Sequence, residues 1–328
     1  MSTAEPELRL FRAGDEAAII AAFEQAYGAE RSLDEWAWRY PDSPAGRPVL
    51  LALEGGRVLA HLGGAPSRVQ LDGRVLAAAQ LVEPFVLPGA GRPEARAALM
   101  SDLLGAFVAE LGPGRRFDLV YRILAAPDGS DVDSAGEGVK LPLPPAVELS
   151  RTKAGASPAR RLAYRAEPAR DFEPRLDELW RRVGTGYPAA VVRDAEHALV
   201  RHAGHPTVKH HRFLVLPRCG RRALAFAAFA RCGEECRWLD LVWDRAHPGA
   251  LELLAHLSGR LARQLGAARE RVLLGGDPEG CSRLGALGFA GAGEPLGTRL
   301  EVAACAPDID LEALASRFYL TACDLEGS

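Results

Sequence analysis

The feature that most constrains the fold is an order of predicted elements that occurs twice along the chain. In residues 8–150, apolar patterning predicts a short strand, two helices, a three-strand meander, a long helix, a buried strand and further strands. A similar order returns in residues 162–304, with no obvious sequence identity between the halves. The sequence therefore predicts a duplicated unit in which helices pack on a mixed sheet, an α+β (α/β mixed sheet) fold.

The first copy carries clear local signals. Asp15 is expected to cap a helix over 15–27, and Ser32 to open a second helix that Pro41 stops. Asp72-Gly73 predicts a tight hairpin between strands at 57–70 and 74–87. A long helix is expected over 93–110, then a strand at 117–124, a short helical segment within 128–138 and strands around 139–150.

The two copies are separated by a segment with the composition of a linker. Residues 151–160 contain Lys153, Gly155, Ser157 and Pro158 and lack a regular apolar pattern. A chain of 328 residues is long enough for two domains of ordinary size. We expect domains at 1–152 and 153–328.

Charge and hydropathy exclude several classes of function. The net charge is −3, with 40 basic and 43 acidic residues, so no bulk charge favours nucleic acid or an anionic membrane. No apolar run is long enough to span a bilayer, and the acidic N-terminus does not have the form of a signal peptide. We expect a cytoplasmic protein with no membrane or nucleic-acid partner, and the sequence leaves its oligomeric state open.

The cysteines raise the question of a metal site. Cys232 and Cys236 form a Cys-x3-Cys pair, with Cys219, His210 and His211 nearby in sequence. Residues 222–230 are expected to form one strand about 30 Å long, which separates Cys219 from that pair. Zinc needs four ligands around one point, so we expect free thiols and no metal.

Two motifs near the ends of the chain resemble those of a known family. The first is the run Trp36-Ala37-Trp38-Arg39-Tyr40-Pro41 followed by Pro44-Ala45-Gly46. The second is the tail Phe318-Tyr319-Leu320-Thr321-Ala322-Cys323-Asp324, and Arg193-Asp194 with His205-Pro206 adds support. Together with the element order, they resemble bacterial two-domain proteins of the GNAT superfamily of N-acetyltransferases. An alternative for the tryptophan motif is plain aromatic packing of a helix.

The resemblance implies two tandem GNAT-like folds and acetyl-CoA as co-substrate. In such enzymes the pantetheine pairs with a bulged strand, here 74–87, and the pyrophosphate sits on amides where the next helix begins. The acceptor would be an amine of a small molecule or peptide. The positions implied for cofactor binding are Phe85, Val86, Leu87, Gly91, Arg92 and Arg96.

The loop departs from the family pattern Arg/Gln-x-x-Gly-x-Gly/Ala. The arginine position is Gly91, and the two glycine positions are Glu94 and Arg96. Pro93 removes an amide donor, and Glu94 brings a carboxylate toward the pyrophosphate. A shift by one residue places Arg92 in the first position and leaves alanines in the glycine positions. The loop of the second copy has no such pattern either, so that domain is expected to be structural.

Two residues are candidates for acid–base chemistry. Glu83 lies on the strand where related enzymes often carry a carboxylate base; the alternative is an exposed or ion-paired strand residue. Tyr121, on the next strand, is the candidate acid for the departing thiolate; the alternative is a core aromatic. His61 is expected to be a packed histidine.

Two functions therefore stay open. One is an acetyl-CoA-dependent N-acetyltransferase that acts on an unidentified amine by direct acyl transfer. The other is a catalytically inactive member of the same fold, a pseudoenzyme that binds a ligand or a partner. No nucleophile elbow, phosphate-binding P-loop or dinucleotide-binding motif favours a different class.

Overall fold

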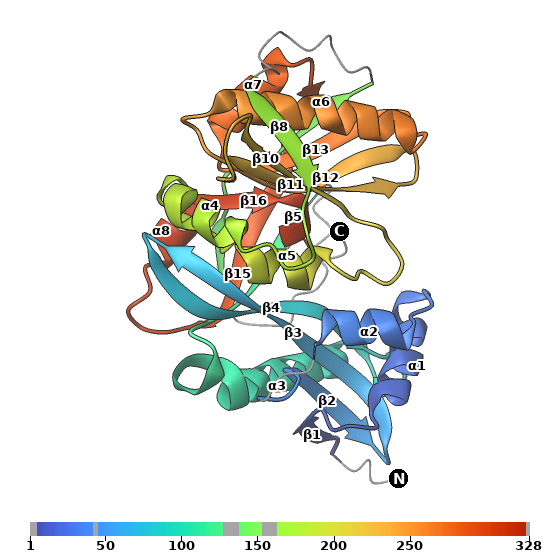
Figure 1. Ribbon diagram of the computed structural model, residues 1–328. Helices are drawn as coiled ribbons and strands as arrows, with labels where there is room; N and C mark the ends of the chain where they lie inside the picture. Colours follow the sequence, from blue (N-terminus) through green and yellow to red (C-terminus); the bar gives the residue numbers. More distant parts are fainter. Residues whose placement is uncertain (1–4, 42–44, 127–137, 153–162, 326–328) are drawn as a thin grey trace. The chain divides into compact units, whose positions relative to one another are not determined.

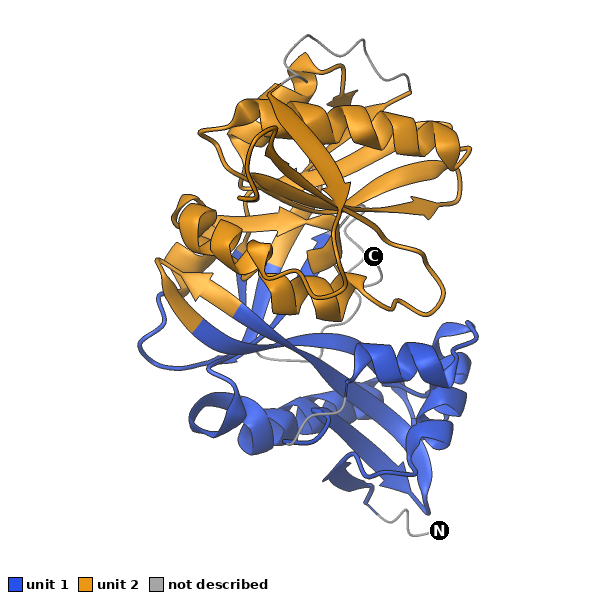
Figure 2. Cartoon of the chain, in the orientation of Figure 1, with its two compact units in different colours: residues 1–68, 76–141, 300–310 blue, residues 69–75, 142–299, 311–328 orange. Residues whose placement is uncertain are grey.

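The computed structural model describes residues 5–41, 45–126, 138–152 and 163–325 (Figure 1). Most of the predicted short helical segment at 128–138 and of the predicted linker lies outside these residues. The chain divides into two compact units (Figure 2). Unit 1 comprises residues 1–68, 76–141 and 300–310, and unit 2 comprises 69–75, 142–299 and 311–328. Each unit thus includes a segment from beyond the expected boundary near 152.

Unit 1 has the element order expected from the sequence, with bounds that differ by a few residues. Its elements are β1 (Glu7–Leu10), α1 (Glu16–Tyr27), α2 (Leu33–Arg39), β2 (Val49–Glu54), β3 (Arg57–Leu71), β4 (Arg74–Val86), α3 (Pro93–Leu111), β5 (Leu119–Ala126), β6 (Val139–Pro142) and, late in the chain, β15 (Gly297–Cys305). Strands β1 to β3 pair antiparallel, β4 pairs parallel with β5, and β15 lies between β5 and β6.

The sheet of unit 1 is covered on both faces. Along β2, Leu51 and Leu53 pack with Trp36 of α2 and Ile19 of α1. Leu50, which points the other way, packs with Leu103 and Phe107 of α3. Successive side chains of a strand point to opposite faces, so a run of apolar residues is buried throughout when helices cover both.

Local sequence signals explain where α2 begins and where the β3–β4 hairpin turns. The Glu35 amide donates to Ser32 Oγ (3.1 Å), and the Ser32 amide donates to the Glu35 carboxylate (2.9 Å), which forms the capping box of α2. Asp72 and Gly73 both have positive φ, +49° and +85°, as a two-residue hairpin turn requires. Asp15 precedes α1, but its side chain accepts bonds from Arg9 and the Arg12 amide and does not cap the helix.

Unit 2 repeats the order. Its elements are β7 (Val147–Arg151), β8 (Tyr164–Pro168), α4 (Arg175–Val183), β9 (Ala189–Val191), α5 (Ala195–His202), β10 (His211–Pro217), β11 (Ala225–Cys232), β12 (Glu235–Trp243), α6 (Pro248–Gln264), β13 (Arg269–Gly275), α7 (Pro278–Ala286), β14 (Ala290–Gly291), α8 (Leu311–Ser316) and β16 (Phe318–Thr321). Strands β8, β10, β11 and β12 pair antiparallel in that order, and β12 pairs parallel with β13.

Helix α6 covers one face of the unit 2 sheet, where Figure 1 shows it across β10 to β13. Its buried residues include Leu251, Leu254 and Leu261, which join a core with Phe226 and Trp238 of the sheet. Strand β13 is also flanked by β7 and β16, both antiparallel to it. Within the residues that the structure describes, no helix has both the length and the apolar character to span a bilayer.

Candidate functional site

Strand β4 runs from Arg74 to Val86, and at Glu83 its extended backbone conformation is interrupted by one left-handed residue. This residue has φ +55°, and apart from Asp72 in the hairpin turn it is the one non-glycine residue of the described chain in that region. A left-handed conformation at a residue with a Cβ costs about 1–3 kcal/mol and persists where the surroundings hold it in place. Such interruptions re-aim side chains and backbone groups, as β-bulges do beside active sites.

The Glu83 carboxylate is buried and lies among three side chains from the α1–α2 region. It forms ion pairs with Arg31 and with Arg39 (Nε to Oε1, 3.3 Å), and Tyr40 Oη donates a hydrogen bond to it (2.9 Å). Glu83 is 6% exposed and Tyr40 is fully buried. The interruption of β4 thus presents its carboxylate to α2 and the loop before it.

This environment fixes the charge of Glu83. Burial alone would raise the pKa of the carboxyl, but the hydrogen bond from Arg31 and the charges of Arg39 and Arg31 outweigh it, so the pKa is lowered. Burial and the neighbouring Glu83 charge raise the pKa of Tyr40 well above its ordinary value. At neutral pH the carboxylate is ionised and Tyr40 is a neutral donor.

His61 and Phe85 pack beneath the same segment. The His61 ring stacks on Phe85 (centroids 5.2 Å apart, 11° between planes), and its Nδ1 lies 3.0 Å from the Glu83 carbonyl oxygen. Burial lowers the pKa of His61, so the ring is neutral at pH 7. His61 is 1% exposed, as expected for a packed histidine.

Strands β4 and β5 pair over a short stretch. The parallel register joins Ala78–Gln80 to Leu119–Tyr121. Among the described residues their pairing stops there, although β4 continues to Val86 and β5 to Ala126. The interruption at Glu83 therefore lies in the stretch of β4 beyond its pairing with β5.

The candidate acid Tyr121 lies at the last paired position of β5. Its side chain is fully buried, and its Oη is 3.4 Å from Ser67 Oγ. Glu83 is three residues past Gln80, the β4 partner of Tyr121, or about 10 Å along a strand. The structure therefore gives the two predicted catalytic residues different partners, two arginines and Tyr40 for Glu83 and Ser67 for Tyr121.

The segment from β4 to α3 carries the residues expected to bind the cofactor. Phe85 is buried in the core, and the Leu87 amide donates to the Leu59 carbonyl (2.8 Å). A 3-10 turn over Pro88–Ala90 follows, and Gly91 adopts φ +125°, a conformation that glycine tolerates.

Helix α3 then begins at Pro93, and no side chain caps it. The amides of Glu94 and Ala95 in its first turn have no partner within the helix. Arg92 and Glu94 are exposed, Arg96 is half-buried and Val86 is half-buried. The helix start thus offers amide donors to solvent, with one carboxylate beside them.

Arg31, Arg39 and Tyr40 were not predicted from the sequence as partners of Glu83. Arg39 and Tyr40 belong to the tryptophan motif, so the motif itself held the signal. Trp36 is buried and packs on Phe11 and Tyr40, with ring centroids 5.2 and 5.6 Å away. Trp36 thus builds core packing, while Arg39 and Tyr40 of the same motif contact the Glu83 carboxylate.

The corresponding segment of unit 2 is covered by its own side chains. Strand β12 pairs with β13 up to Trp238, and two tyrosine hydroxyls contact the backbone beyond that point. Tyr319 Oη donates to the Leu241 carbonyl (2.7 Å), and Tyr187 Oη lies 3.2 Å from both the carbonyl oxygen and the amide nitrogen of Trp243. These bonds occupy backbone groups of Leu241 and Trp243 in β12.

Comparison with solved structures identifies the fold. A GCN5-related N-acetyltransferase (GNAT) from Anabaena variabilis ATCC 29413 aligns with a TM-score of 0.64 and 11% identity, over 91% of this chain and 73% of that one. A GCN5-related N-acetyltransferase from Kribbella flavida aligns with a TM-score of 0.63 and 14% identity, over 92% and 71%.

A tandem GNAT protein from the clavulanic acid biosynthesis pathway aligns with a TM-score of 0.55 and 16% identity, over 92% of this chain and 99% of that one. No family model matches the sequence, and no curated protein matches it significantly. The chain has the fold of GNAT N-acetyltransferases, and one of the solved structures that it resembles is a tandem GNAT protein. The fold predicted from the sequence is confirmed.

Proposed function

We propose that unit 1 is an acetyl-CoA-dependent N-acyltransferase that acts on an amine of a small molecule or peptide. The observation that carries this proposal is the β4 segment. It leaves its partner β5 after Gln80, is interrupted at Glu83, and leads into a helix start without a side-chain cap. In a GNAT fold this is where the thioester and the pyrophosphate bind.

The pyrophosphate would be held at the start of α3. The amides of Glu94 and Ala95, the positive end of the helix dipole and the charges of Arg92 and Arg96 favour an anion there. The Glu94 carboxylate opposes it. Two charges about 4 Å apart in water interact by about 1 kcal/mol, so Glu94 would weaken binding without preventing it.

The chemistry would be direct transfer. The amine nitrogen attacks the thioester carbonyl carbon, the carbon–sulfur bond breaks, and the thiolate takes a proton while the nitrogen loses one. Tyr121 is the candidate donor to the thiolate. Glu83, ionised with a lowered pKa and held by two arginines, is a weak proton acceptor, so we assign it to holding the interrupted strand in place.

Unit 2 would be the structural half. Its corresponding strand segment is occupied by Tyr187 and Tyr319. Helix α6 begins in a crowded place, since a Cβ on its second residue, Gly249, would lie 2.6 Å from the Tyr164 ring. We therefore expect at most one acetyl-CoA per chain.

Calorimetry with acetyl-CoA tests binding, and one matched pair of variants tests the location. Glu94→Gln removes the opposing charge and should tighten binding about fivefold at low salt, with a smaller gain as salt rises. Glu110→Gln, also exposed but near the other end of α3, should leave the affinity unchanged. No binding at millimolar acetyl-CoA would refute the acyltransferase and favour a catalytically inactive binding protein.

Turnover tests the role of Tyr121 as the proton donor. With a panel of amines and detection of released thiol, Tyr121→Phe should lower kcat by about 10²- to 10⁴-fold, and Tyr164→Phe in unit 2 should leave it unchanged. Unchanged kcat in Tyr121→Phe would remove this hydroxyl from the reaction.

A further inference from the structure

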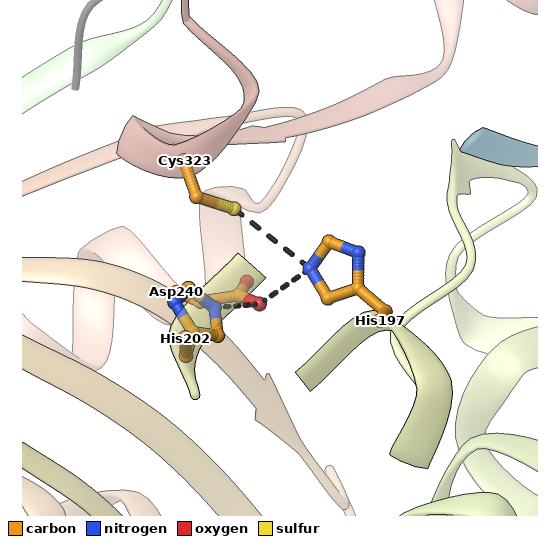
Figure 3. Close-up of side chains that lie close together, drawn as sticks. All are labelled: His197, His202, Asp240 and Cys323. Atoms are coloured by element: carbon orange, nitrogen blue, oxygen red, sulfur yellow. Dashed lines mark hydrogen bonds and ion pairs between the residues drawn. The ribbon is translucent and has the colours of Figure 1, made fainter. Parts of the chain in front are cut away.

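Four potential metal ligands from distant parts of the sequence meet in unit 2. They are His197 and His202 of α5, Asp240 of β12, and Cys323 of the turn after β16 (Figure 3). One ligand atom from each residue lies within 4.8 Å of the other three. All four residues belong to unit 2, His197 is half-buried, and His202 and Asp240 are 2% and 1% exposed.

The ligand atoms point to one place. His197 Nε2 is 3.1 Å and His202 Nε2 is 3.2 Å from the same atom, Asp240 Oδ2. Cys323 Sγ is 4.0 Å from His197 Nε2. Zinc bonds of about 2.0–2.3 Å in tetrahedral geometry set neighbouring ligand atoms about 3.3–3.7 Å apart. The three printed pairs need shifts of a few tenths of an ångström, and a pair at the 4.8 Å limit of the cluster needs to close by about 1 Å.

This arrangement differs from that of a nucleophilic cysteine. In a Cys–His–Asp triad, one imidazole nitrogen faces the sulfur and the other faces the carboxylate. Here Nε2 of His197 faces both Cys323 and Asp240, and Figure 3 shows the two dashed lines meeting at that nitrogen. A shared nitrogen cannot relay a proton between the two groups, but it can join them in binding one cation.

The charges buried around the cluster favour a cation. Asp240 and Asp324 are both paired with Arg193, so these three buried side chains together carry one net negative charge. A divalent ion together with an ionised Cys323 would add one net positive charge. The three negative charges, on Asp240, Asp324 and the Cys323 thiolate, would then balance the ion and Arg193. Buried charges are tolerated when they are paired in this way.

The second layer of contacts also suits metal ligands. The other carboxylate oxygen, Asp240 Oδ1, accepts bonds from Arg193 Nε (2.7 Å) and the Leu241 amide (2.9 Å), which hold Oδ2 toward the histidines. The far nitrogen of His202, Nδ1, lies 3.4 Å from Nδ1 of His210. Ligating histidines and carboxylates are oriented by hydrogen bonds of this kind.

We propose that His197, His202, Asp240 and Cys323 bind one structural Zn²⁺ ion that ties α5 and the C-terminal turn to β12. The set of two imidazoles, one thiolate and one carboxylate is borderline-soft, which suits zinc better than magnesium or calcium. Four protein ligands leave no open position, so the ion would have no catalytic role.

Metal analysis of the full chain, purified without chelator or metal-affinity resin, tests the proposal. We expect about one zinc per chain, with a loss of at least tenfold in both His197→Gln and Cys323→Ser. Cys281→Ser, half-buried in the same unit but outside the cluster, should retain it. Less than 0.1 zinc per chain in the wild type after zinc loading, or full zinc in Cys323→Ser, would overturn the proposal.

Cobalt substitution of the wild type gives an answer that needs no variant to fold. Co²⁺ bound to a thiolate should show an intense near-ultraviolet charge-transfer band and tetrahedral visible bands, both displaced by one equivalent of Zn²⁺. A spectrum of octahedral, aquated cobalt alone would refute the site. These readouts do not involve acetyl-CoA, so they succeed or fail independently of the proposed acyltransferase.

Discussion

Replacing Glu83 by glutamine tests whether this carboxylate holds β4 in place. The variant keeps the size and an acceptor for Tyr40, and it keeps a Cβ at φ +55°, so the backbone strain is the same in both proteins. What changes is the charge. Arg31 and Arg39, with side chains 13% and 15% exposed, lose their one shared counterion.

The loss of folding stability should be large, although the substitution only replaces a carboxylate oxygen by an amide nitrogen. Removing one partner of a buried ion pair destabilises proteins by about 3–5 kcal/mol, because the remaining charge stays desolvated. Since both guanidinium groups retain some exposure, we expect the lower end, about 3 kcal/mol, which is more than a hundredfold in the unfolding equilibrium. A pair with one well-exposed partner is worth about 0–1 kcal/mol.

The loss should depend on pH in a defined direction. The pKa of Glu83 is lowered in the folded state, so its ion pairs stabilise the protein above the ordinary carboxyl pKa of 4.5. That stabilisation is lost as the pH falls from there through the lowered folded value. The difference between wild type and Glu83→Gln should therefore be constant from pH 6 to 8 and shrink below about pH 4.5.

Urea unfolding combined with hydrogen exchange by mass spectrometry measures the effect, because exchange assigns it to unit 1. Peptides from α2 and β4 should exchange faster in Glu83→Gln. The control is Glu7→Gln, whose carboxylate is 63% exposed and 3.7 Å from Arg9, and it should change stability by less than 1 kcal/mol. A loss in Glu83→Gln no larger than in this control would refute the anchoring role.

Three further predictions concern packing. Gly63→Ala should destabilise the protein by about 1–3 kcal/mol or more in chemical unfolding, because its Cβ would lie 2.2 Å from Tyr40 Oη. Gly105→Ala lies in a helix with open space around the new Cβ and should stabilise the protein by about 0.5–1 kcal/mol. Equal effects of the two substitutions would contradict the close approach of Gly63 to Tyr40. Tyr319→Phe should lower stability by about 1–2 kcal/mol and leave acetyl-CoA affinity unchanged; weaker binding would place the cofactor in unit 2. Phe107→Ala, fully buried, should cost about 3–5 kcal/mol, and a loss below 1 would contradict its core position.

Most elements of the fold were predictable because their signals are local. The capping box at Ser32 and the positive φ values at Asp72-Gly73 arise from neighbouring residues. Which residues belong to each of the two units was harder to predict. Residues 300–310 belong to unit 1 because they meet β5 through contacts such as Arg122 with Glu301, and no local pattern encodes a partner 179 positions away.

The candidate site was predictable in its position and not in its chemistry. The strand, the loop and Glu83 itself follow from the element order. The partners of Glu83 do not, because Tyr40 is 43 residues away and reaches it through the fold. An aromatic motif on a helix predicts core packing as readily as it predicts contacts to a carboxylate. The positive φ at Glu83 could not be predicted either, because glutamate rarely adopts that conformation and nothing in the sequence marks it.

The cysteines show the same limit. Cys219, Cys232 and Cys236 are close in sequence, and this spacing drew attention to them as possible metal ligands. The structure instead brings Cys323 to His197, 126 positions earlier in the chain. Sequence spacing finds metal sites when the ligands share one short segment, and this cluster draws on a helix, a strand and the C-terminal turn.

The segment exchange between the units has a consequence for the order of events during synthesis. Residues 300–310 complete unit 1, and β15 lies beside β5 in its sheet. At about 5–20 residues per second, the ribosome reaches residue 310 roughly 8–30 s after residue 152. Until then β5 has an unpaired edge, which is the kind of strand that pairs wrongly with other chains. Unit 1 therefore cannot finish folding until residues 300–310 have been synthesised, which is after most of unit 2.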